Sequence, residues 1–96
     1  MLNNKQKSYL KKLANQKNSL FQVGKDGCTE NLYRTLNDSL VVHELIKISV
    51  LKTCPTEIRE VAFDVAANTQ SQIIQIIGRV ITIYRPNNNG GKIQLP

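Results

Sequence analysis

Apolar residues recur at helical spacing in three segments of the chain. They are Tyr9, Leu10, Leu13 and Ala14 in the first segment, Leu32, Leu36 and Leu40 in the second, and Ile58, Val61, Ala62 and Val65 in the third. In each segment these positions fall on one side of a helix, which is typical of a helix that packs against a core. We therefore predict helices from Asn3 to about Asn15, from about Glu30 to His43, and from the Pro55–Glu57 region to about Thr69.

Four other segments have the patterns of β-strands, at Leu20–Val23, Leu45–Leu51, Gln72–Ile77 and Val80–Arg85. The second alternates apolar and polar residues, as a half-buried strand does. The last two are rich in isoleucine and valine, and the two-residue link Gly78-Arg79 between them is typical of a tight antiparallel hairpin. Pro86 ends the last strand, and residues 87–91 have the composition of a loop. Residues 92–96 are either a short edge strand or a frayed tail.

The predicted order of elements is helix–strand–helix–strand–helix–strand–strand. Strands that alternate with helices imply a crossover and at least one parallel pair, whereas the final hairpin is antiparallel. We therefore predict an α/β fold in which helices pack on a mixed four-stranded sheet. The 96 residues suffice for one domain and leave no room for a second, so we take residues 1–96 as a single domain.

The formal net charge of +6 is unevenly distributed along the chain. Residues 1–25 contain six lysines and no acid, all seven acids lie between Asp26 and Asp64, and residues 65–96 contain three bases and no acid. If the fold brings the two cationic ends together, one face is positive, as expected of a protein that binds a polyanion. The first predicted helix carries its lysines away from its apolar side, at Lys5, Lys7, Lys11 and Lys12. That face suits a phosphate backbone, although a solvated helix face has the same pattern.

Gly24-Lys25-Asp26-Gly27 forms a GxxG motif between a predicted strand and a predicted helix. Glycines allow a close approach of the backbone, and the N–H groups at the start of a helix can accept a phosphate. Lys25 adds a full positive charge. KH domains clamp nucleotides with a GxxG loop, but theirs joins two helices, so we do not assign this chain to them. A turn that needs glycines only for its geometry explains the motif equally well.

The sequence contains few features of an enzyme or a metal site. Cys28 and Cys54 are too few for a disulfide scaffold and lack zinc-site spacing, and His43 is the only histidine. No paired-carboxylate or nucleotide-binding motif is present. We therefore expect no catalysis, no metal, no cofactor and no small-molecule substrate. The N-terminus lacks the apolar region of a signal peptide and no apolar run could cross a bilayer, so we expect a cytoplasmic protein without membrane contact.

Several motifs in order along the chain resemble the CRM domain (chloroplast RNA splicing and ribosome maturation), specifically the stand-alone bacterial YhbY-type proteins. They are the lysine-rich first helix, residues 23–30 (VGKDGCTE), residues 43–47 (HELIK), residues 77–80 (IGRV) and residues 83–86 (IYRP). The resemblance implies a fold like the C-terminal domain of translation initiation factor three with an extra N-terminal helix. It also implies RNA binding, association with ribosomal RNA of large-subunit precursors, and a role in ribosome assembly.

We therefore predict a monomer that binds structured RNA. The GxxG loop and the following helix N-terminus are expected to grip one phosphate segment while the N-terminal lysines neutralise its neighbours. The candidate contact residues are Gly24, Lys25, Asp26, Gly27, Lys5, Lys7, Lys11, Lys12, Arg79 and Arg85. An alternative is a protein-interaction module that docks on acidic ribosomal or regulatory partners, since its charge pattern would be the same.

Overall fold

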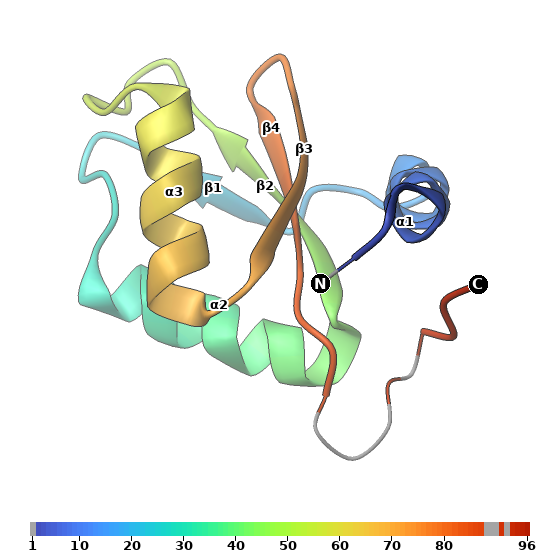
Figure 1. Cartoon of the computed structure of the whole chain (residues 1–96). Coiled ribbons are helices and arrows are strands. Elements are labelled where there is room, and N and C mark those ends of the chain that lie inside the picture. The colour runs from blue at the N-terminus through green and yellow to red at the C-terminus, as the bar shows by residue number, and fades with distance from the viewer. Residues whose placement is uncertain (1, 88–90, 92) are drawn as a thin grey trace.

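The computed structural model describes residues 2–87, 91 and 93–96. The elements follow the predicted order (Figure 1): α1 (Asn4–Asn15), β1 (Phe21–Val23), α2 (Glu30–His43), β2 (Leu45–Val50), α3 (Ile58–Thr69), β3 (Gln72–Ile77) and β4 (Val80–Tyr84). The strands form one sheet in the order β1-β2-β4-β3, with β1 parallel to β2 and the other neighbours antiparallel. The predicted α/β fold with a mixed four-stranded sheet is confirmed.

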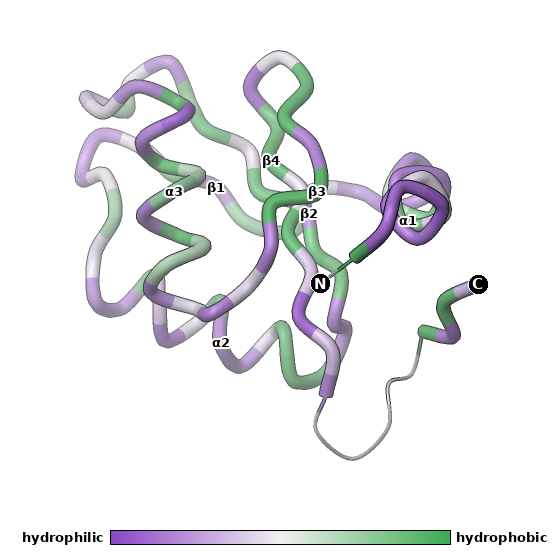
Figure 2. Tube along the Cα trace, viewed as in Figure 1, coloured by the Kyte–Doolittle hydropathy of each residue, from purple (hydrophilic) through white to green (hydrophobic). Residues whose placement is uncertain are grey.

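Helices cover both faces of this sheet, because its strands are apolar on both sides. On one face, the buried side chains of α2 and α3 pack against Ile46, Ile48, Ile81 and Ile83. On the other face, α1 packs through Leu10 and Ala14 against a second cluster that contains Leu45, Ile74 and Tyr84. Figure 2 shows the consequence, with hydrophobic strands at the centre and α1 largely hydrophilic on its outer side. The fold is therefore three layers, α2 and α3, the sheet, and α1.

Local side-chain hydrogen bonds fix where the helices begin and end. Asn3 and Gln6 form a reciprocal capping box at the start of α1, with N–H to oxygen distances of 2.8 and 3.1 Å. Thr29 caps α2 by accepting a hydrogen bond from the N–H of Leu32 at 3.1 Å, as predicted. Lys47 Nζ donates to the carbonyls of residues 14 and 17 at 3.1 and 3.2 Å. This cation interacts favourably with the negative end of the α1 helix dipole, and its hydrogen bonds connect α1 to β2.

The last residues of the chain are held by a buried carboxylate. Glu44 follows α2 with a positive φ of 64° and has no exposed surface. Its Oε2 accepts the N–H of Asn87 at 2.7 Å and its Oε1 accepts the N–H of Ile93 at 3.0 Å. Ile93 and Leu95 then pack against the cluster under α1. The described residues 93–96 are thus neither a strand nor a frayed end, whereas positions 88–90 and 92 of the predicted loop and tail lie outside the described residues.

Candidate nucleic-acid interface

Residues 24–27 form a tight turn that joins β1 to α2. The N–H of Gly27 donates to the carbonyl of Gly24 at 3.0 Å, and Gly27 has a φ of 65°, which glycine adopts without strain. Lys25 and Asp26 occupy the two central positions and are exposed, while both glycines are half-exposed. A Cβ at Gly24 would meet only ordinary contacts, 3.6 Å from Leu51 Cδ1 at the nearest. The turn therefore presents its tip to solvent.

A hollow of about 410 Å³ lies beside this turn, between β1 and the first turns of α2. Leu32 lines it together with the polar side chains of Gln22, Asn31 and Thr35. Glu30 occupies the first position of α2, where its carboxylate already complements the positive end of the helix dipole. Lys25, more than the helix N-terminus, therefore supplies the positive charge that would attract a phosphate here.

Two further connections meet the turn at the same end of the sheet, at the upper left and top of Figure 1. The N–H of Leu51 donates to the carbonyl of Val23 at 2.9 Å. Arg79, at the tip of the β3–β4 hairpin, donates from Nε to the Val50 carbonyl at 2.7 Å and from Nη2 to the Leu51 carbonyl at 2.8 Å. Its side chain nevertheless remains exposed. Arg79 thus both fastens the hairpin to β2 and leaves a cation near the turn.

Lys52 is an exposed cation at this end of the sheet that the sequence analysis did not select. It directly follows β2, whose parallel neighbour β1 leads into the glycine turn. The carboxyl ends of adjacent parallel strands lie at the same edge of a sheet, so the predicted parallel pair was a signal that could have identified Lys52.

The lysines of α1 lie elsewhere. Lys5, Lys11 and Lys12 are exposed and Lys7 is half-exposed. However, α1 packs on the sheet face opposite α2, and Figure 1 shows it at the right, whereas the glycine turn is at the left. The expectation that these lysines lie beside the turn is wrong, because β1 carries the chain away from α1 before the turn begins. The predicted positive face is therefore two groups of cations, one on α1 and one at the turn.

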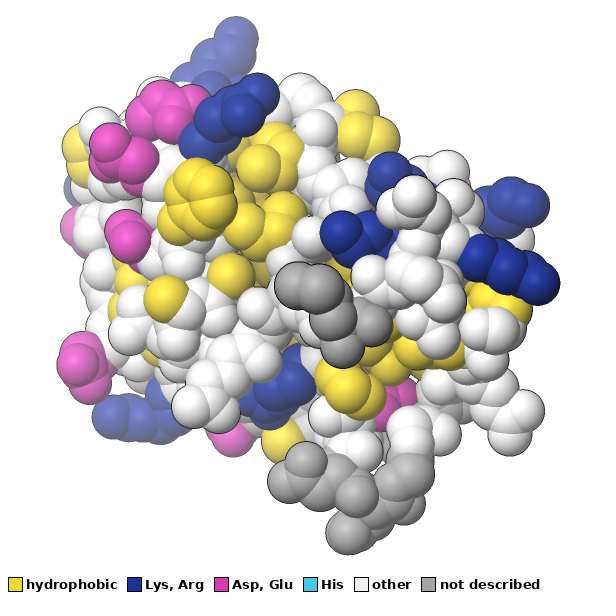
Figure 3. Space-filling model, viewed as in Figure 1, with side chains coloured by type: hydrophobic (Ala, Val, Ile, Leu, Met, Phe, Trp, Pro, Cys, Tyr) yellow, Lys and Arg dark blue, Asp and Glu magenta, His cyan; other side chains and the backbone are white. Residues whose placement is uncertain are grey.

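Acidic side chains are concentrated on the layer formed by α2 and α3. Figure 3 shows them at the left, over these helices, with some Lys and Arg side chains among them, while at the right, over α1, only Lys and Arg side chains project. The sequence explains this separation, because residues 1–25 and 65–96 contain no acid. Three acids lie outside these two helices: Glu57 caps α3, Asp26 is exposed in the glycine turn, and Glu44 is buried in the interior. The α2–α3 side of the molecule, the acidic side, thus carries exposed acids together with cations, whereas α1 carries cations and no acid.

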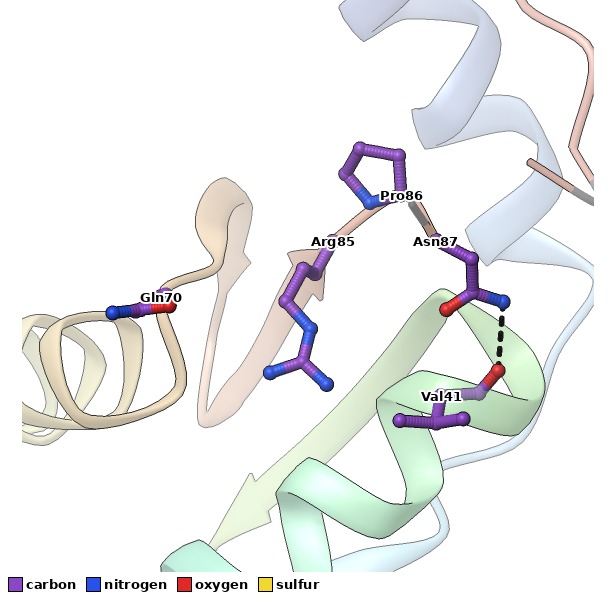
Figure 4. A pocket seen from close by; sticks show the side chains of 5 residues that line it. All are labelled: Val41, Gln70, Arg85, Pro86 and Asn87. Atoms are coloured by element: carbon purple, nitrogen blue, oxygen red, sulfur yellow. Dashed lines mark hydrogen bonds between the residues drawn. The ribbon is translucent and has the colours of Figure 1, made fainter. Parts of the chain in front are cut away.

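Arg85 has mainly a structural role. It is half-buried, and its Nη1 donates to Asn37 Oδ1 at 2.6 Å and to the Thr69 carbonyl at 2.7 Å, while its Nη2 donates to the Asn37 carbonyl at 3.1 Å. Figure 4 shows its guanidinium pointing into the hollow between Gln70 at the end of α3 and Val41 on α2. These bonds join β4 to both helices. Its guanidinium is thus engaged within the fold, and its contact with RNA stays a prediction.

Of the two thiols, Cys28 lacks the environment of a nucleophile. Both are partly buried. Burial raises the pKa of the Cys28 thiol, although a hydrogen bond with Tyr33 partly opposes this rise. A raised pKa keeps sulfur in its unreactive protonated form, the opposite of what a catalytic cysteine requires. Burial, followed by the hydrogen bond with Cys28, raises the pKa of Tyr33 to about 12.

These shifts predict a loss of stability in alkali. Because the pKa of Tyr33 is raised from 10.0 to about 12 on folding, its contribution is complete below pH 10 and is lost as the pH rises toward 12. We expect Tyr33→Phe to make the free energy of unfolding fall less steeply over this interval. Urea titrations at a series of pH values measure the slope. An unchanged slope in the variant would show that Tyr33 titrates alike in the folded and unfolded chains.

Two other kinds of site receive no support from the geometry. Within residues 2–87, 91 and 93–96, no three side chains among the histidines, cysteines, aspartates and glutamates gather where they could hold a metal ion. Among the same residues, no helix has the combination of length and apolar character that is needed to span a membrane.

Comparison with known proteins assigns the chain to a family. The model of the CRS1 / YhbY (CRM) domain matches residues 2–85. The chain is 36% identical over 96 residues to the "Probable RNA-binding protein YqeI" of Bacillus subtilis, covering 100% of both chains. It is 34% identical over 95 residues to an "RNA-binding protein" of Haemophilus influenzae, covering 99% of this chain and 95% of the other. The solution structure of a hypothetical protein from Staphylococcus aureus superposes with a TM-score of 0.81 at 40% identity, covering 100% of both chains. The chain therefore belongs to the CRS1/YhbY (CRM) domain family.

Proposed function

We propose that this protein binds structured RNA as a monomer in the cytoplasm and that its target is ribosomal RNA in precursors of the large ribosomal subunit, where it acts as an assembly factor. RNA binding is supported by the names of its relatives and by the family, which is one of RNA-binding domains rather than of enzymes. The ribosomal target is supported by the resemblance of the sequence motifs to CRM proteins of the YhbY type. No catalytic step is part of the proposal.

The observation that carries the proposal is the solvent-facing turn at Gly24–Gly27. Lys25 stands at its tip, and Lys52 and Arg79 are exposed on the two connections that meet it. A narrow turn flanked by cations can follow a sugar–phosphate chain closely, because no bulky side chain separates the backbones. The lysines of α1 extend the contact to phosphates further along the RNA. This division into two cation groups favours an extended, folded RNA over a short phosphorylated ligand.

Lys25→Ala tests the role of the turn. One phosphate contact contributes a salt dependence of slightly under one log unit in affinity per log unit of salt. At physiological ionic strength its loss corresponds to about a fivefold weaker affinity. Titration of a folded ribosomal RNA fragment at several salt concentrations, followed by fluorescence anisotropy, measures both quantities. Arg34→Ala removes an exposed cation from the acidic side and serves as the control, with less than about a twofold effect expected.

Crosslinking of the protein to RNA in cells, followed by mapping of the reads, tests the proposed target. We expect the reads to concentrate on large-subunit ribosomal RNA and on its unprocessed precursors. Reads spread evenly over messenger RNA would contradict the ribosomal part of the proposal while leaving RNA binding intact. Protein that docks on an acidic partner instead of RNA would not be displaced from that partner by free structured RNA.

A further inference from the structure

The face of the sheet that carries α1 is only partly covered by that helix. Directly paired residues point to the same face, and Thr82 pairs with Lys47 on β2 and with Gln75 on β3. Since Lys47 reaches the carbonyls at the end of α1, this row lies on the α1 face. In the next row Val80 pairs with Ser49 on β2 and with Ile77 on β3. Ser19 of the α1–β1 link contacts Ser49 at 2.7 Å, whereas Ile77 is 61% exposed. The strip of sheet on the β3 side, between the end of α1 and the β3–β4 hairpin, is therefore open to solvent.

A cavity of about 210 Å³ occupies this strip, and its walls are Asn15, Lys47, Gln75, Ile77, Val80 and Thr82. The pairing of β3 with β4 shifts in register between Ile73 and Gln75. This shift allows Ile74 to pack under α1 while Gln75, a wall residue of the cavity, still pairs with Thr82. The cavity is several times the volume that one water molecule occupies in the liquid, about 30 Å³, but smaller than pockets for drug-sized ligands, which begin at about 300 Å³. It therefore suits a single small ring system.

The hydroxyl of Thr82 is the second observation that points to a ligand. The side chain is 1% exposed, and its Oγ1 is the one buried side-chain polar atom without a hydrogen-bond partner among the residues that the structure describes. Such an atom is uncommon in a folded protein, because a buried hydroxyl without a partner is destabilising. Valine has the same shape and would avoid that cost. Thr82 is among the wall residues of the cavity, so a ligand seated there is a partner for this hydroxyl once the side chain turns toward it.

The charge around the cavity indicates which class of ligand. None of its wall residues is acidic, and Lys47 is among them. Exposed Lys12 lies in the last turn of α1, which ends at the wall residue Asn15, and exposed Arg79 directly precedes the wall residue Val80. An RNA that contacts both cation groups would cross this strip. The amides of Asn15 and Gln75 can each donate and accept hydrogen bonds, as the edges of a base require, while Ile77 and Val80 offer an apolar surface to its ring.

We propose that this cavity receives one unpaired nucleobase of the bound RNA and that Thr82 and Gln75 hydrogen-bond to its edge. The inference rests on the proposed RNA-binding function. The turn and the lysines of α1 require only phosphates, whereas the cavity requires a single-stranded nucleotide. A blunt RNA duplex offers no such base, so the two kinds of contact are separable by experiment.

Thr82→Val and Gln75→Ala test this site. Each removes about one hydrogen bond, so we expect about a fivefold weaker affinity for a short single-stranded RNA and no change for a blunt duplex of the same length. The midpoint of thermal unfolding of Thr82→Val should be equal to or above that of the wild type, because the variant keeps its packing and loses an unpaired polar atom. Gln72→Ala, three positions earlier on β3 and outside the cavity walls, is the matched control and should bind both RNAs as the wild type does.

Equal affinities of Thr82→Val, Gln75→Ala and wild type for single-stranded RNA would overturn the inference. Losses of the same size in Gln72→Ala, or on the blunt duplex, would overturn it too, since the effect would not belong to a base in this cavity. Failure of the proposed function has a different signature. In that case the wild-type protein would bind neither RNA, and Lys25→Ala would have no effect to measure.

Discussion

Replacing Lys11 and Lys12 with glutamate is expected to weaken binding to all RNAs alike, by about 30-fold or more at physiological ionic strength. Both side chains belong to α1 and are exposed. Loss of two phosphate contacts reduces the dependence of log affinity on log salt by about 1.8, which corresponds to this factor at about 0.15 M salt. Anisotropy titrations with several unrelated structured RNAs over a range of salt concentrations measure the affinity and the slope together.

A matched control separates the position of the charge from its amount. Arg34→Glu with Arg59→Glu changes the net charge by the same amount, but on α2 and α3, where the acidic side chains lie. We expect this control to bind RNA far more tightly than the α1 variant. Equal losses in the two variants would indicate a response to net charge alone, and unchanged affinity of the α1 variant would refute a role for that helix. Circular dichroism verifies that α1 still forms.

Glu44→Ala is expected to lower the free energy of unfolding by about 3 kcal/mol. Its carboxylate accepts the N–H groups of Asn87 and Ile93, and the side chain is fully buried. Alanine leaves these donors without their acceptor and retains the unfavourable positive φ of 64°. Urea denaturation measures the change. Because Ile93 loses its acceptor, the amide protons of residues 93–95 should also exchange faster with solvent.

Glu60→Ala provides the comparison for this substitution. Glu60 is exposed on α3, so its removal should change the free energy of unfolding by less than about 0.5 kcal/mol. Glu44→Gln, which keeps one oxygen acceptor but replaces the other with a donor, should fall between the two. A loss of under about 1 kcal/mol in Glu44→Ala would mean that the buried carboxylate is replaced by water without cost, and that the tail packs independently of it.

The sequence was sufficient to predict every helix and strand, and to predict most of their boundaries to within one residue. The limits of α2 and β3 agree with the prediction, because a capping threonine and a glycine link mark two of their ends. β1, β2 and β4 are each one residue shorter than predicted, at Leu20, Leu51 and Arg85, although the N–H of each of these residues still donates to a backbone carbonyl of the neighbouring segment. The order of elements predicted at least one parallel pair and the antiparallel hairpin, and both are present. It did not predict that β1 pairs with β2 or that the strand order is β1-β2-β4-β3.

The arrangement of the site was less accessible, because it depends on contacts between distant parts of the chain. The pattern at Arg85 predicts a cation at a strand end, but not that Asn37 and Thr69 take up its donors. Likewise, Glu44 has the appearance of a surface acid at a helix end, and only the fold shows that it binds the N–H groups of the tail. The amphipathic pattern of α1 predicts which side of the helix is buried. It does not predict which face of the sheet that side packs against.

The uneven distribution of charge between α1 and the α2–α3 layer has a kinetic consequence. Cations without acids on α1, and both signs over α2 and α3, give the molecule an electric dipole, which experiences a torque in the field around a nucleic acid. We therefore expect the protein to approach RNA with α1 leading. Much of the advantage of this arrangement lies in the rate of productive encounter rather than in the lifetime of the complex, and added salt should slow association more than it speeds release.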